Sequence, residues 1–187
     1  MALSVQSRAE RVGTFRYIQV FLMETLARWV PRTAEMEVKV LFGRHIWDLA
    51  QQADALGKRT HELRAPLQFS LRPSETYANF LTDFAATAGT REKISGFYDA
   101  VLPGLTVRYE RYLAATDSLL DEPTVREIKR SLGDFVRMRE ERDALIAELP
   151  QLALNNKEWP ESLARREAAE TNIVMHRAAA AVAGKVS

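Results

Sequence analysis

The chain has 187 residues, of which 47% are hydrophobic, so it can bury a sizeable core within one domain. With 26 basic and 25 acidic side chains its formal net charge is +1, which gives no general electrostatic reason to expect nucleic acid as a partner. The absence of cysteine excludes disulfides, thiolate metal sites and cysteine nucleophiles.

Helical periodicity dominates the sequence, and glycine and proline fall between the periodic segments. The predicted helices span about 7 or 14 to 30, 33 to 63, 74 to 88, 91 to 102, 103 to 119 and 123 to 149. Pro31 closes the first of them, Thr33 is the predicted N-cap of the second, and Pro150 ends the last. Pro103 and Pro123 each lie at a predicted helix start, where proline is well tolerated.

The last part of the chain has a different character. Asn155-Asn156 and Trp159-Pro160 indicate an irregular connector, and the Ala-rich segment 161–183 is helix-prone with a weak apolar stripe. We therefore divide the chain into a helical bundle over residues 1–150 and a connector with a C-terminal helical extension over 151–187. This extension is expected to lie along the bundle or along a partner subunit.

The order of these elements predicts the fold class. Two long helices are followed by a crossing segment between Pro66 and Pro73 and then by further helices, and we find no strand signal. This order is typical of an all-α antiparallel bundle with one long crossover.

Ionisable side chains interrupt the apolar stripes of the first two helices. Glu24 lies in the first helix, and His45 and Asp48 lie in the second. Such groups are costly inside a bundle unless they are paired or bind a metal, so they indicate a metal site, a polar network or a helix edge. The second half has a similar pair, because 24 positions separate Glu24 from Asp48 and also Glu110 from Asp134.

With this pattern and the crossover layout, the chain resembles the ferritin-like superfamily of di-iron carboxylate bundles over roughly residues 14–145. In that superfamily one helix supplies a Glu and the next a Glu-x-x-His motif, and the pair is repeated. The resemblance implies Glu24 and Glu110 as the lone carboxylates, and Asp48 and Asp134 as the carboxylates of the two motifs.

Both motifs depart from the superfamily pattern at the histidine. Gln51 and Arg137 stand in its place, and a fixed positive charge at Arg137 opposes the binding of a divalent cation. His45 instead precedes Asp48 by three positions, which places both on one helix face. With Glu24 and Glu110 they would offer one metal a nitrogen and oxygen ligand set.

Ordinary structural roles are open for the same residues. His45 would then be a hydrogen-bonded core residue, and Glu110 a solvated surface residue. The acids would pair locally: Glu24 with Arg28, Asp48 with Arg44 or a neighbouring helix, and Asp134 with Arg137 or Arg130.

Three functional hypotheses follow. In the first, the protein is a non-catalytic relative of the di-iron bundles that needs no cofactor and binds a partner or a small molecule. In the second, it is an iron- or manganese-dependent oxidase or oxygenase with Glu24, His45, Asp48 and Glu110 as ligands and Asp134 as a further one. In the third, it is a metal-free enzyme with His45 as general base, oriented by Asp48 or Glu24.

The sequence also bears on cellular location and on oligomeric state. No apolar run approaches the ~20 residues that span a bilayer, and residues 1–13 lack a long apolar stretch. We expect a cytoplasmic protein without membrane contact. The aromatic content and the C-terminal helix favour a homodimer, which deletion of the chain from Trp159 onward would weaken.

Overall fold

A computed structural model describes residues 3–175, and all regular structure within that range is helical, which confirms the all-α class. The elements are α1 (Val5–Trp29), η1 (Val30–Arg32), α2 (Met36–Glu62), α3 (Glu75–Ala85), α4 (Thr90–Ser95), η2 (Gly96–Val101), α5 (Leu102–Ala115), α6 (Glu122–Glu148), η3 (Pro150–Leu152) and α7 (Glu158–Ala169). None of these helices is long and apolar enough to cross a membrane.

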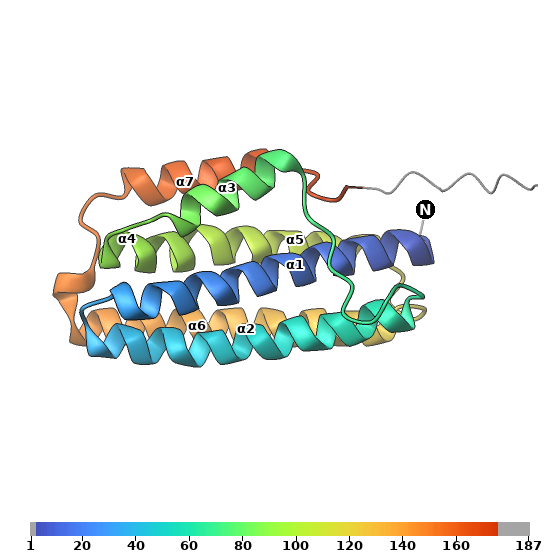
Figure 1. Ribbon diagram of the computed structural model, residues 1–187, viewed down its shortest axis with the longest axis horizontal. Coiled ribbons are helices and arrows are strands. Elements are labelled where there is room, and N and C mark those ends of the chain that lie inside the picture. The colour runs from blue at the N-terminus through green and yellow to red at the C-terminus, as the bar shows by residue number, and fades with distance from the viewer. Residues whose placement is uncertain (1–2, 176–187) are drawn as a thin grey trace, which may run out of the picture.

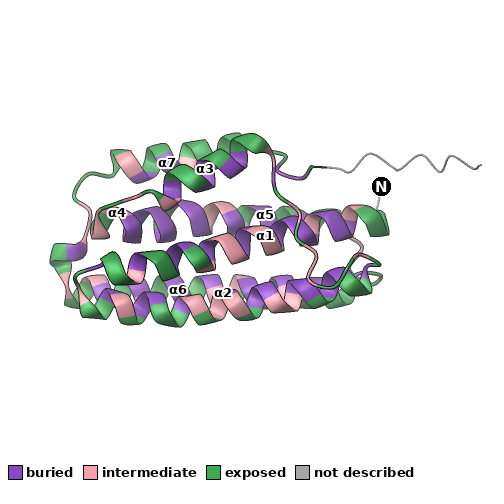
Figure 2. Cartoon of the chain, viewed as in Figure 1, coloured by how far each residue is buried: buried purple, intermediate pink, exposed green. Residues whose placement is uncertain are grey.

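The long helices form a bundle in which α1 packs on α2, α2 on α6, and α6 on α5 (Figure 1). The segments α4, η2 and α5 make one composite helix that runs in the same direction as α2. The loop after α2 and helix α3 carry the chain back along the bundle, and this return is the predicted long crossover. Buried residues line the inward faces of the helices and occupy nearly all of η2 (Figure 2).

Local sequence signals explain most helix ends, with one correction. Ser4 caps α1 by accepting a hydrogen bond from the Ser7 amide, and Ser74 caps α3 in the same way. The prediction that Thr33 caps α2 is wrong, because α2 begins at Met36 without a side-chain cap. Since Pro31 continues α1 into the short helix η1, the Thr33 hydroxyl instead donates to the Trp29 carbonyl and closes α1.

Pro103 lies in the first turn of α5, as predicted, but no break precedes this helix, because the chain runs from α4 through η2 directly into α5. Proline inside a helix lacks the amide hydrogen and clashes with the carbonyl four residues earlier. Here the segment η2 is π-helical, and the Leu102 amide bonds to the Phe97 carbonyl, five residues back. This wider turn opens the helical ladder directly before Pro103 and accommodates it.

The described part of the C-terminal extension lies along its own bundle. Helix α7 ends at Ala169, earlier than predicted, and residues 176–187 of the expected helix lie outside the described residues. It packs on η2, where a β-carbon at Gly96 would lie only 2.9 Å from Trp159 and 3.2 Å from Leu163. Leu152, Leu163 and Ile173 belong to the same core as the bundle.

Candidate functional site

The five predicted ligand residues do not come together. Glu24 is exposed on α1 and pairs with Arg28 at 3.6 Å, and Glu110 is exposed on α5. His45, Asp48 and Asp134 do converge, between α2 and α6. Among the residues that the structure describes, no group of three or more His, Cys, Asp or Glu side chains is arranged to hold a metal ion.

The guanidinium of Arg137 occupies the space between the acids of α2 and α6. Its nitrogens lie 3.2 Å from Asp48, 3.0 Å from Asp134 and 3.2 Å from Glu141. The hydrogen bond to Asp134 and the charge of Asp48 raise the pKa of Arg137 despite partial burial, so the side chain keeps its charge. The expected pair of Asp134 with Arg137 is present, and Asp48 finds its partner on the neighbouring helix.

Both ring nitrogens of the buried His45 have partners. Nδ1 lies 2.6 Å from the Tyr98 hydroxyl, and Nε2 lies 3.2 Å from a carboxylate oxygen of Glu141. Burial lowers the pKa of His45 more than Glu141 raises it, so the imidazole is neutral at pH 7. Because a carboxylate only accepts, Nε2 donates to Glu141, and the Tyr98 hydroxyl donates to Nδ1.

The protonation states of Glu141 and Tyr98 agree with these donor and acceptor roles. Although burial opposes ionisation, hydrogen bonds from Arg137 and His45 lower the pKa of Glu141. Burial raises the pKa of Tyr98 well above its ordinary value, which keeps its hydroxyl protonated and able to donate. The Arg142 guanidinium lies 5.4 Å from the centre of the Tyr98 ring and bonds to Asp99.

Two buried glutamines extend the cluster into the bundle core. The Gln52 amide nitrogen donates to Asp134 at 3.0 Å, and its oxygen accepts from Gln19 at 2.8 Å. Gln19 also lies 2.8 Å from the Tyr109 hydroxyl. A chain of polar contacts therefore joins α5, α1, α2 and α6 and returns to the composite helix at Tyr98.

Several members of this interior network were not predicted as such from the sequence, namely Gln19, Gln52, Tyr98, Tyr109 and Glu141. A signal for one of them exists, since Gln52 follows His45 by two helical turns and so shares its inward face. Gln51, which the resemblance placed at the histidine position, is exposed.

Two grooves border the network between α2 and α6. One of about 220 Å³ is lined by Trp47, Gln51, Asp134 and Arg137, among others. The other, of about 470 Å³, is lined by Met36, Val40, Arg44 and Ala144 and reaches Glu141. His45 lines neither of them.

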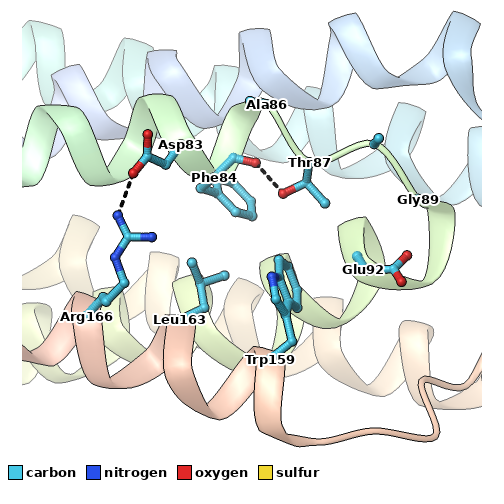
Figure 3. Close-up of a pocket in the computed structure, with 10 residues that line it drawn as sticks. Asp83, Phe84, Ala86, Thr87, Gly89, Glu92, Trp159, Leu163 and Arg166 are labelled. Carbon is cyan, nitrogen blue, oxygen red and sulfur yellow. Dashed lines mark hydrogen bonds and ion pairs between the residues drawn. The ribbon is translucent and has the colours of Figure 1, made fainter.

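Helix α7 borders further hollows, two of which have volumes of about 300 Å³ or more. Figure 3 shows one of about 300 Å³, where Trp159 and Leu163 point from α7 toward Phe84 and Arg166 pairs with Asp83 at 2.5 Å. The other has about 550 Å³ and lies between α4, α6 and the start of α7. Its wall is apolar at Ile94, Ile146, Leu152 and Pro160 and charged at Arg91, Asp99, Arg142, Asp143, Lys157 and Glu161.

Comparison of the chain with protein-family models, with curated proteins and with solved structures found no match.

Proposed function

We propose that the protein is a non-catalytic bundle of the ferritin-like kind, in which Arg137 replaces the metal, and that it works by binding a small molecule or a partner. The ion pairs of Arg137 with Asp48, Asp134 and Glu141 carry this proposal. A guanidinium supplies permanent positive charge and several fixed donors, so it neutralises clustered carboxylates and opposes the entry of a divalent cation.

The alternatives receive less support from the same contacts. The oxidase hypothesis needs Glu24 and Glu110 as ligands, yet both are exposed and away from His45. The general-base hypothesis needs a nitrogen of His45 that a substrate can reach, whereas the ring is fully buried and both nitrogens are occupied.

The groove between α4, α6 and α7 supports the binding role. Its volume of about 550 Å³ lies within the range typical of small-molecule sites. The apolar wall at Ile94 and Ile146 would cover the body of an organic molecule, while Arg91 and Lys157 would meet a polar end. We therefore propose a compact organic molecule with one polar end as the ligand class.

Elemental analysis of the purified chain tests the non-catalytic assignment. The protein is produced with iron supplementation and is then loaded anaerobically with ferrous or manganous ion. We expect far less than one metal ion per chain, because Arg137 is present among the acids. One or two tightly bound ions per chain would overturn the proposal.

If metal is found, substitutions at the two exposed acids Glu24 and Glu110 test whether they are its ligands. Loss of bound metal in Glu24→Gln and Glu110→Gln would establish the oxidase ligands, since both changes are on the surface and leave the core intact.

A further inference from the structure

The outer face of α2 carries an unusual line of apolar side chains. Met36 is 64% exposed, Val40 49% and Trp47 66%. Gly43 lies between them, and a β-carbon there would meet no atom within 4 Å. Among the described residues, each of the other helices has at most one large exposed apolar side chain.

The spacing of this line is that of a helix–helix contact. Met36, Val40, Gly43, Trp47 and Ala50 follow one another at intervals of four, three, four and three residues. This is the heptad spacing of residues that pack against a second helix. The inner face of α2, with Val38, His45 and Leu56, already packs in the bundle, so the outer line is unpartnered within the chain.

We propose that the occupant of this face is a second copy of the chain, with α2 packed antiparallel on α2 about a two-fold axis near Gly43. Gly43 is the midpoint of the line between Met36 and Ala50, so the axis brings the two glycines together. Trp47 of each copy then lies over Val40 of the other. Because glycine has no side chain, space remains between the helices at the axis, and the large Trp47 rings lie beside it. A symmetric contact of this kind closes at two subunits.

The size of the face agrees with a stable dimer. Helices α2 and α6 each have 27 residues, and helices of that length are about 40 Å long. Two packed helices are about 20 Å wide. The face of the two helices together therefore measures about 800 Å², so it has room for the area that a standard interface takes from each partner when α2 packs at its centre and α6 at its edge.

Charge does not oppose this pairing. The net charge of each copy is only +1, so two copies have little general repulsion. Arg44, the cation next to Gly43, lies 4.0 Å from Glu141 of its own α6. Helix α7, which was expected to lie along the bundle or along a partner subunit, packs on η2, α3 and α5 of its own bundle and leaves the outer face of α2 uncovered.

A cysteine cross-link tests the position of the axis, because the chain has no cysteine of its own. Gly43→Cys is expected to form a disulfide-linked dimer on mild oxidation, since the two α-carbons near an axis come within disulfide range. Gly133→Cys is the matched control, because Gly133 is also exposed on a helix with open space around it. Equal cross-linking of the two variants, or none in Gly43→Cys, would overturn the proposed axis.

Sedimentation velocity of the full chain over a concentration series tests the contact itself. We expect a dimer whose dissociation constant rises at least about 30-fold in Trp47→Glu, since central interface tryptophans dominate binding. Leu120→Glu is the control, because Leu120 is 69% exposed in the loop before α6. A monomer at every concentration, or a dimer that Trp47→Glu leaves unchanged, would refute the proposal.

Discussion

Removal of the Arg137 guanidinium is the sharpest test of the interior network. In Arg137→Met the carboxylates of Asp48, Asp134 and Glu141 lose their common cation and repel one another. Arg137 is 42% exposed, so solvent screens each ion pair, and partly exposed pairs contribute about 0.2–1 kcal/mol each. We expect a loss of about 1–2 kcal/mol in the free energy of unfolding at pH 7.

Urea unfolding followed by circular dichroism measures this loss. With a denaturant slope of about 2 kcal/mol/M, the midpoint should fall by about 0.5–1 M at pH 7. The pKa of Glu141 is lowered in the folded wild type, so its pairing stabilises the fold above the ordinary carboxyl pKa and this contribution is lost as the pH falls through the folded pKa. The difference between wild type and variant should therefore shrink as the pH falls below about 4.

Two control variants and one added ion sharpen the interpretation. Arg137→Lys keeps the charge and should restore part of the stability. Arg126→Met removes a single exposed pair, with Glu122 of the same helix, and should cost less than about 0.5 kcal/mol. Manganous ion should raise the urea midpoint of Arg137→Met and leave the wild type unchanged. The reasoning would be refuted if Arg137→Met lost the same free energy of unfolding at pH 7 and below pH 4, or if manganese stabilised the two proteins equally.

Three further predictions concern other parts of the molecule. Burial lowers the pKa of His45 in the folded protein, so below about pH 6.5 only the unfolded chain gains a proton at this residue. The free energy of unfolding should therefore fall there by up to about 1.4 kcal/mol per pH unit. His45→Gln should flatten this slope, as measured by urea titrations at pH 7.5 and 5.5. Arg108→Met leaves the buried Glu167 without its 2.7 Å partner and should cost about 3–5 kcal/mol, with faster proteolysis of α7. Gly104→Ala should destabilise the protein because its β-carbon would overlap the Glu167 carboxylate, whereas Gly133→Ala should raise the thermal midpoint through helix propensity.

The helical class and most helix ends could be predicted because they depend on neighbours in sequence. Proline positions set the ends of α1 and α6, and apolar periodicity separated inward from outward residues. Local ion pairs such as Glu24 with Arg28 could be predicted for the same reason. The same signals predicted Pro103 in a first helical turn, but they did not predict the π-helical turn that keeps this helix continuous with α4.

The interior network was largely beyond sequence reasoning because its partners are distant in the chain. His45 bonds to Tyr98 and Glu141, which are 53 and 96 positions away. The equal spacing from Glu24 to Asp48 and from Glu110 to Asp134 did not predict whether these side chains point into the bundle. The rotational phase of each helix decides which face a residue occupies. Glu24 and Glu110 fall on outer faces, whereas the two aspartates face each other across α2 and α6.

The π-helical turn at Gly96–Val101 has a consequence for aligning this chain with other helical bundles. A π-turn corresponds to one additional residue within an otherwise regular helix. Deleting one residue there would let α4 and α5 continue as an ordinary helix in the same bundle, while Tyr98 would rotate away from His45. A one-residue gap at this point of an alignment therefore separates chains that share only the architecture from chains that also share the buried histidine–tyrosine contact.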